Sequence, residues 1–213
     1  MRVVVVLGHP SADSYCAAIF NAIVSSLRKK HQVTEIRLAD EKFTTAMTCK
    51  ERHAYETDSP LISDDTRRHA QLLLEAEALI FVYPTWWSGL PAQLKGWIER
   101  VFVLGVAFKF NEKNQIRPNL NNIRHIIGVS TYGSPWRYVK LVNDNGRRTL
   151  TRSLRASTGL RTRTMWHGIY ALDTCTAEQR EKFITNTARK ISKRLDNSER
   201  KIARKLDKPQ SNK

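Results

Sequence analysis

The chain has 213 residues, of which 41% are hydrophobic and 26% are charged, a composition typical of a globular protein rather than a disordered or fibrous one. It has no apolar run of about eighteen residues, so no transmembrane helix is expected, and Val3–Leu7 is followed by no signal-peptide cleavage site. The cysteines Cys16, Cys49 and Cys175 are widely spaced. This spacing excludes a disulfide framework and a cysteine-rich zinc site, and it favours the reducing cytoplasm.

The formal net charge of +16 is unevenly distributed. Residues 180–213 carry twelve Lys or Arg against four Asp or Glu, and residues 137–163 carry eight Lys or Arg against Asp144. Such runs indicate either a solvated surface or an anionic partner. We expect a single domain over residues 1–195 and a basic C-terminal tail over 196–213. The tail could bind an anionic surface. Binding of nucleic acid is not expected, because the positive charge is the one feature that supports it.

Hydrophobic patterning predicts alternating strands and helices in chain order. A polar excursion is expected over residues 39–63, and an interruption at 143–146 within the fourth helix. The expected strands are Val3–Leu7, Val33–Leu38, Ala78–Tyr83, His125–Ser130 and Arg163–Tyr170. The expected helices are 15–29, one capped by Asp64 or Asp65 and ending near Ala76, 91–102, 137–157 and 176–195. This alternation predicts an α/β fold with a parallel sheet.

Three loops follow strands at the carboxyl edge of this sheet, where ligands of open α/β folds bind. They are Gly8–Tyr15, Pro84–Leu90 and Thr131–Trp136.

The first loop is rich in hydroxyl groups and leads into a helix, which suits an anion at the helix N-terminus. Alternatively, Ser11, Asp13 or Ser14 is a plain N-cap. The dinucleotide glycine fingerprint and the Walker motif are both absent. Cys16 is either a small buried side chain or a thiol with a lowered pKa.

The second and third loops carry aromatic residues. Trp86 and Trp87 are adjacent and suit a flat aromatic ligand, or else one is buried in the core and the other lies in a dimer interface. In the third loop, Tyr132 and Trp136 either contact a ligand or pack on the neighbouring helix.

Other polar residues have simpler interpretations. His125 and His167 lie inside expected strands and are interpreted as core histidines, and no metal site is expected. Gly96, inside a helix, indicates a close backbone approach, for which a dimer seam is one candidate place. Three arginines could meet the 2′-phosphate of a dinucleotide or could be surface charges: Arg147, Arg148 and Arg152.

Several motifs together resemble the flavodoxin-like NAD(P)H quinone oxidoreductase family, and in particular its short bacterial NAD(P)H-dependent oxidoreductase branch. They are His9-Pro10, Ser14-Tyr15, Tyr83–Trp87, Pro91–Val101 and Thr131–Gly133. The resemblance covers residues 1 to 175. It implies a flavodoxin-like open parallel five-stranded sheet in the order 2-1-3-4-5, with helices on both faces, a homodimer and a bound flavin.

The resemblance also implies which residues contact the flavin. The first loop would hold the phosphate, the second would line the isoalloxazine rings, and the third would contact their other side. These residues are, in turn, His9, Ser14, Tyr15 and Cys16; Pro84, Thr85, Trp86, Trp87 and Ser88; and Thr131, Tyr132 and Gly133. Tyr138 matches a family tyrosine that assists hydride transfer, and a backbone N–H of the Tyr132–Gly133 turn would donate to the flavin edge.

The sequence departs from the family pattern at three positions. Cys16 replaces an Asn, Tyr132 replaces a Gly, and Asp144 replaces a His. We therefore expect no dedicated acid–base pair, with the cofactor supplying the chemistry.

The expected function is flavin-dependent transfer of a hydride from NAD(P)H to a quinone or a similar aromatic acceptor. The alternative is a flavoprotein that acts mainly as a regulatory or ancillary subunit of a membrane transport system. FMN is favoured because the sequence offers no extra segment for an adenosine, with FAD left open. The acceptor and the choice between NADH and NADPH also stay open.

Overall fold

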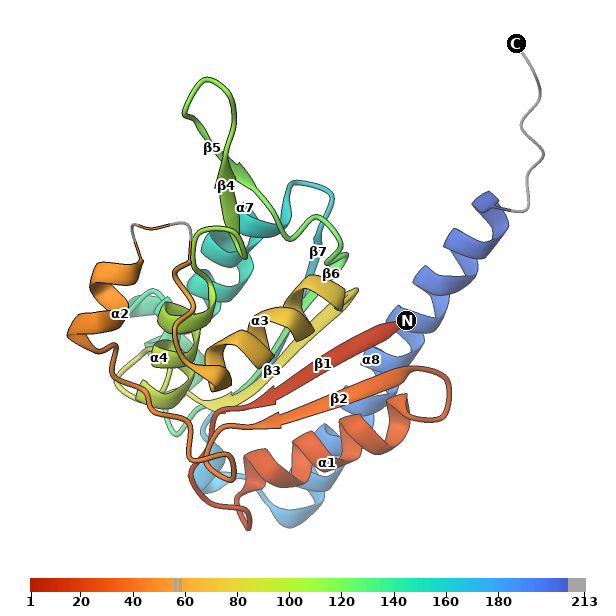
Figure 1. Ribbon diagram of the computed structural model, residues 1–213. Coiled ribbons are helices and arrows are strands. Elements are labelled where there is room, and N and C mark those ends of the chain that lie inside the picture. Colours follow the sequence, from red (N-terminus) through yellow and green to blue (C-terminus); the bar gives the residue numbers. More distant parts are fainter. Residues whose placement is uncertain (56, 58, 207–213) are drawn as a thin grey trace.

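The computed structural model describes residues 1–55, 57 and 59–206 (Figure 1). Its main sheet has five parallel strands in the order β2-β1-β3-β6-β7. Their bounds are β1 Arg2–Leu7, β2 Gln32–Arg37, β3 Ala78–Pro84, β6 His125–Thr131 and β7 Arg163–Ile169. Numbered along the chain within the sheet, this order is 2-1-3-4-5, so the predicted flavodoxin-like topology is confirmed.

Each face of the sheet is covered by helices (Figure 1). Side chains alternate along a strand, so Val3 and Val5 face one way while Val4 and Val6 face the other. The first pair packs against α1 (Tyr15–Leu27) and α8 (Ala177–Leu206). The second pair packs with α3 (Asp64–Glu75), α4 (Ala92–Val101) and the helices between β6 and β7. Burial on both faces explains why these strands are continuous apolar runs.

The crossover between β6 and β7 is interrupted as predicted. Helix α5 (Trp136–Leu141) ends before Asp144, whose left-handed φ of 39° breaks the helix. The carboxylate of Asp144 then accepts a hydrogen bond from the Arg147 N–H at 3.2 Å. Three short segments complete the crossover: α6 Asn145–Arg148, the π-helix η1 Thr149–Ser153 and α7 Leu154–Thr158.

The excursion at residues 39–63 contains a helix that the sequence interpretation did not predict. Helix α2 (Cys49–Ala54) begins with a capping box in which Thr48 and Glu51 exchange hydrogen bonds. The N-cap of α3 is Ser63, so the prediction that Asp64 or Asp65 caps this helix is wrong. Ser63 has extended backbone angles, whereas the two aspartates already belong to the first helical turn.

A short antiparallel hairpin, also unpredicted, lies between α4 and β6. It consists of β4 (Phe108–Phe110) and β5 (Ile116–Pro118) and projects from the body of the molecule (Figure 1). A further short element, the 3-10 helix η2 (Leu172–Thr174), follows β7.

Gly96 permits the close approach that the sequence indicated, but within the chain rather than at a dimer seam. A Cβ at this position would lie 2.1 Å from the carbonyl oxygen of Thr45. The excursion therefore crosses α4 at backbone contact.

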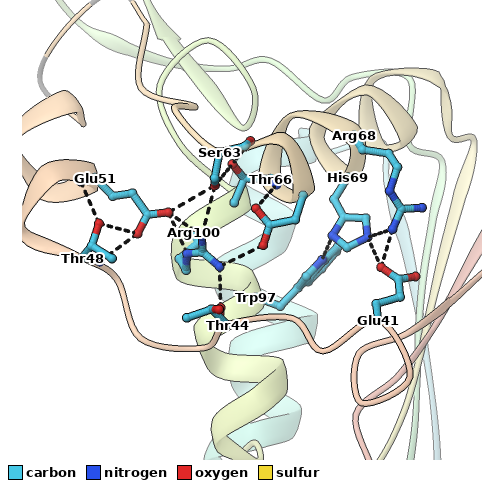
Figure 2. A network of polar contacts seen from close by, with 11 residues as sticks. Glu41, Thr44, Thr48, Glu51, Ser63, Thr66, Arg68, His69, Trp97 and Arg100 are labelled. Atoms are coloured by element: carbon cyan, nitrogen blue, oxygen red, sulfur yellow. Dashed lines mark hydrogen bonds and ion pairs between the residues drawn. The ribbon is translucent and has the colours of Figure 1, made fainter.

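The same crossing encloses a network of polar side chains (Figure 2). Arg100 donates to Glu51 at 2.5 and 2.8 Å, to Asp65 at 3.3 Å, to Ser63 at 3.1 Å and to the carbonyl of Thr44. Burial alone would raise the pKa of Glu51, but hydrogen bonds from Arg100 and Thr48 lower it below its ordinary value. Arg100 thus joins the excursion, α3 and α4.

His69 forms a second buried group beside this network (Figure 2). It accepts a hydrogen bond from Trp97 Nε1 at 3.1 Å and lies 2.8 Å from Glu41. Burial lowers the pKa of His69.

Helix α8 continues past the predicted end at residue 195 as far as Leu206. Three of its later residues contact the domain: Asp196 pairs with Lys30 at 3.0 Å, Ser198 lies 2.8 Å from His125, and Glu199 pairs with the N-terminal amine of Met1 at 2.6 Å. The expected tail therefore starts as the last turns of a helix, and its residues 207–213 lie outside the described part of the chain. In that part, no helix combines the length and apolarity needed to span a bilayer.

Candidate active site

The three predicted loops meet in one groove at the carboxyl ends of β1, β3 and β6. The groove has a volume of about 800 Å³. Of the residues predicted to contact a flavin, nine line it: His9, Tyr15, Cys16, Pro84, Thr85, Trp86, Trp87, Thr131 and Gly133. The groove thus combines aromatic rings, hydroxyl groups and backbone amides.

Ser14 lies at the start of α1 and acts as its N-cap. Its hydroxyl accepts from the Ala17 N–H at 3.1 Å and donates to the Ser11 carbonyl at 2.9 Å. The N–H groups of Tyr15 and Cys16, the first two of the helix, have no acceptor among the described residues. Free N–H groups at the N-terminus of a long helix suit an anion, because the helix dipole adds to their partial charge.

His9 and Tyr15, which both line the groove, are held in place by hydrogen bonds. The Nδ1 atom of His9 accepts from the Ser11 N–H at 2.9 Å, and burial lowers the pKa of this imidazole. Its ring lies 5.8 Å from that of Trp86. The hydroxyl of Tyr15 donates to the Arg180 carbonyl at 2.7 Å, so its ring is anchored to α8.

Cys16 is buried, and its Sγ lies 3.5 Å from the hydroxyl of Thr131. Burial raises the pKa of this thiol to about 11. The interpretation of Cys16 as a small buried side chain therefore holds, and a lowered pKa is contradicted.

The second loop presents its tryptophans to solvent. The exposed fraction is 47% for Trp86 and 102% for Trp87. Trp87 and Ser88 both have left-handed backbone angles, with φ of 48° and 58°, which residues other than glycine adopt at a cost. The turn is closed by a hydrogen bond from Gly89 N–H to the Trp86 carbonyl at 3.0 Å. The backbone thus holds Trp87 outward without support from packing.

Thr85 ties the second loop to the third. Its hydroxyl lies 2.7 Å from that of Ser130, and its N–H donates to the Thr131 carbonyl at 2.8 Å.

In the third loop, the side chain of Tyr132 is buried beneath the turn. Its ring stacks on Tyr170 at 4.6 Å between centroids, and its hydroxyl donates to Asp144 at 2.9 Å. Burial, with the adjacent Asp144 carboxylate, raises the pKa of Tyr132 far above its ordinary value. Since the Tyr132 N–H donates to Ile169, the free donor of this turn is the Gly133 N–H, which has no acceptor among the described residues.

Tyr138 lies in a side pocket of about 220 Å³ rather than in the groove itself. The pocket shares Thr85, Trp87 and Gly133 with the groove and also contains Ser88 and Asp144. Tyr138 is 52% exposed, so its hydroxyl is accessible to a molecule bound there.

Sequence reasoning included Ser134 in the third loop without naming it as a contact, and it missed two further residues of the groove, Leu172 and Asp173. Asp173 lies 3.2 Å from the position of a Cβ on Gly133, which places a carboxylate beside the third loop. Leu172 and Asp173 belong to η2, at the carboxyl end of β7. Inspection of the loop after the fifth strand would have found them, because all parallel strands end at one edge.

The interpretation of His125 as a core histidine is confirmed. His125 is buried and lies 2.8 Å from Ser198, and burial beside Arg194, Arg163 and Arg124 lowers its pKa to about 4. His167 is partly buried, and its Nε2 has no partner among the described residues. Within that part of the chain, no group of three His, Cys, Asp or Glu residues could hold a metal.

Comparison with known proteins identifies the family. Residues 1–195 match the model of a family described as having the flavodoxin-like fold, and the chain belongs to this family. One similar protein is the "uncharacterized NAD(P)H oxidoreductase YcaK" of Escherichia coli, 34% identical over 120 residues, which are 54% of this chain and 61% of that protein. Another is NAD(P)H dehydrogenase [quinone] 1 of Cavia porcellus, 30% identical over 153 residues, or 64% of this chain and 55% of the relative.

The chain therefore spans less than two thirds of the length of both relatives. Among solved structures, an FMN-dependent NADH-azoreductase from Bacillus anthracis in complex with FMN is 14% identical, with a TM-score of 0.75 over 91% of this chain and 98% of that one. At this identity the likeness concerns the fold.

Proposed function

We propose that this protein is a flavin-dependent NAD(P)H oxidoreductase that passes a hydride through a bound flavin to a quinone or a similar aromatic acceptor. The observation that carries the proposal is the meeting of three distant loops in one groove, with exposed indole rings at one place and free helix-terminal N–H groups at another. The relatives are named as NAD(P)H oxidoreductases or quinone dehydrogenases, which supports this assignment.

The groove offers groups that suit the phosphate and the rings of a flavin. The N–H groups of Tyr15 and Cys16 would bind its phosphate, with His9 nearby. Trp86 and Trp87 would line the isoalloxazine rings together with Pro84 and Thr85. Fully exposed indole surface is costly in water, so a stacked aromatic ligand would remove it from solvent.

When bound, the flavin would take a hydride from the nicotinamide ring and give it to the acceptor. The protein would orient the rings and stabilise charge. The unpaired Gly133 N–H is placed to donate a hydrogen bond to a carbonyl edge that gains negative charge. The Tyr138 hydroxyl, in the side pocket, is a second donor toward a molecule bound there.

FMN is the flavin that we propose. The azoreductase from Bacillus anthracis, which shares the fold, is FMN-dependent and supports this choice. We further propose a homodimer, since the hairpin exposes Phe110 by 48% and Ile116 by 63%. A cytoplasmic location fits the three free cysteines.

One observation favours the alternative of an ancillary subunit. The last turns of α8 extend beyond the sheet (Figure 1), and three basic residues there are exposed: Arg200, Lys201 and Arg204. They could dock on an anionic partner. Turnover of NAD(P)H that survives removal of these turns would favour the enzyme, and its loss would favour the subunit.

The decisive experiment is the absorbance spectrum of the purified protein, followed by identification of any released flavin. If the first loop binds the phosphate, FMN should raise the melting temperature more than riboflavin does. Ser14→Asp keeps a good N-cap but adds a negative charge, so it should abolish this difference, whereas Ser14→Asn should preserve it. Equal shifts by FMN and riboflavin in the unmodified protein would contradict the phosphate assignment.

A further inference from the structure

A second large cavity adjoins α5 through Trp136, Val139 and Lys140, whereas Tyr138 of the same helix lines the side pocket. The cavity has a volume of about 580 Å³ and is bounded by α5, the crossover helices and the edge strand β7. We call it the basic cleft because five cationic side chains line it: Lys140, Arg147, Arg148, Arg152 and Arg155.

The helical repeat explains why these charges gather. Arg148, Arg152 and Arg155 are separated by four and then three residues, a spacing that places side chains on one helical face. Arg147 lies over the ring of Trp166 at 5.9 Å. Lys140 approaches from α5, over the ring of Trp136 at 5.0 Å.

Within the described part of the chain, the charges of the basic cleft have no counter-ions. Among the described residues, none of the five cations has a carboxylate oxygen within 4.0 Å. The one acidic residue of the lining, Asp144, accepts instead from the Tyr132 hydroxyl and the Arg147 N–H. Like charges four residues apart on a helix repel one another, so the arrangement costs stability unless an anion binds.

The remaining lining indicates the kind of anion. Trp136, Trp166 and Tyr170 contribute aromatic surface to the same cleft. Guanidinium groups match phosphate oxygens, and aromatic rings stack with bases, so the combination suits a phosphorylated nucleoside better than an inorganic ion.

The basic cleft adjoins the candidate active site. Val139 and Asp144 line both the cleft and the side pocket of Tyr138, and this pocket shares Gly133 with the groove. A ligand with one ring in the groove and phosphates in the basic cleft would span these cavities. A nicotinamide dinucleotide has this construction.

We propose that the basic cleft binds the phosphorylated adenosine half of the nicotinamide dinucleotide and thereby makes NADPH the preferred hydride donor. The inference rests on the proposed function, whose reaction supplies the dinucleotide. The 2′-phosphate of NADPH adds a charge of about −1.5 to −2 at neutral pH, which the unpaired arginines can neutralise. NADH lacks this group and gains less from the cleft.

The test compares two double variants of the flavin-loaded protein. Arg148→Ala with Arg152→Ala removes two cleft cations at a spacing of four residues. Arg189→Ala with Lys193→Ala removes two cations at the same spacing on α8, and serves as the control. We expect the cleft variant to raise the KM for NADPH by at least about tenfold, with a much smaller change for NADH. The control should change neither value. Equal changes for both donors, or none, would overturn the inference.

Binding without turnover separates this inference from the proposed function. Adenosine 2′,5′-bisphosphate, titrated calorimetrically, should bind more tightly than adenosine or inorganic phosphate, should compete with NADPH, and should lose affinity in the cleft variant. Absence of binding, or binding without competition, would overturn the inference. Reduced nicotinamide riboside, which has no phosphate, then tests the enzyme itself. If the riboside is oxidised equally by all variants while NADPH has no advantage over NADH, the proposed function stands and the cleft assignment fails.

Discussion

Arg100 and the arginines of the basic cleft carry the same charge in opposite surroundings. The side chain of Arg100 is 4% exposed, and its acceptors include two carboxylates, while Arg148 and Arg152 have no carboxylate partner among the described residues. A buried guanidinium without partners costs several kcal/mol, so Arg100 requires counter-ions inside the fold. An accessible guanidinium can stay hydrated until a ligand arrives. The comparison separates an arginine that stabilises the structure from arginines available for binding.

The largest expected effect follows from breaking the enclosed network. Arg100→Met should lower the free energy of unfolding by about 3–5 kcal/mol, because it leaves the buried Glu51 carboxylate without its main partner. Arg152→Ala is the matched control and should change the same quantity by less than about 0.5 kcal/mol. Urea denaturation measures both. Similar losses in the two variants would contradict the distinction drawn between these arginines.

His125 extends the comparison to a buried base surrounded by cations. Its pKa is lowered from 6.5 to about 4, so the unfolded chain binds a proton more readily at mildly acidic pH. The stabilisation should be fully present above the pKa of His125 in the unfolded chain, 6.5. It should be lost as the pH drops toward the pKa in the folded protein, about 4. The expected loss from about pH 8 to about pH 5 is about 2 kcal/mol. His125→Gln should remove this part of the pH dependence, whereas exposed His53→Gln should leave it.

Two tryptophans repeat the contrast between enclosed and available side chains. Trp97 is fully buried, with its N–H bonded to His69, whereas Trp87 is fully exposed. Trp87→Ala should weaken flavin binding or acceptor turnover at least tenfold, about 1.4 kcal/mol, and leave stability nearly unchanged. Trp97→Phe should instead lower the melting temperature. Flavin titration and thermal denaturation distinguish the two, and normal flavin content and kinetics in Trp87→Ala would contradict the placement of the second loop.

The smallest effect on the site is expected at the end of α8. Truncation after Asp196 removes the contact of Ser198 with His125 and the ion pair of Glu199 with the Met1 amine. His125 lies at the start of β6, at the end of the sheet opposite the groove. Stability should fall by about 1 kcal/mol. Flavin content and turnover should be nearly unchanged, and any salt-sensitive binding to anionic vesicles should weaken. A truncated protein without flavin would show that these turns support the site.

The sheet could be predicted because its signals are local. Val3–Leu7 and Ala78–Tyr83 are continuous apolar runs, and only burial on both faces accommodates them. The hairpin and α2 were not predicted, because elements as short as these depend on a few polar contacts rather than on apolar patterning. The Thr48 and Glu51 capping box was present in the sequence as a visible signal for α2. The backbone contact at Gly96 shows another limit. A single glycine in a helix indicates that another segment approaches closely, but the sequence does not show which segment it is.

The site was predictable to the level of its loops rather than its side chains. Carboxyl ends of parallel strands must share an edge, so the meeting of the loops follows from topology. The inward burial of Tyr132 does not follow from topology, because it depends on contacts with Tyr170 and Asp144, which both lie far from Tyr132 in the sequence. The basic cleft was predicted in part, because the sequence indicated three of its arginines as candidate phosphate contacts. Lys140 and Arg155 join them through the packing of α5 and α7, which the sequence does not show.

The outward position of Trp87 also gives the molecule an optical signal of its own. An indole fully in water emits at longer wavelength than one packed in a core, and an aromatic molecule stacked on it quenches the emission. Trp97 supplies the buried reference within the same chain. Occupancy of the groove can therefore be followed by tryptophan fluorescence without any label. The left-handed turn at Trp87 and Ser88 keeps this ring in solvent, so the indole of Trp87 reports the binding of a ligand in the groove.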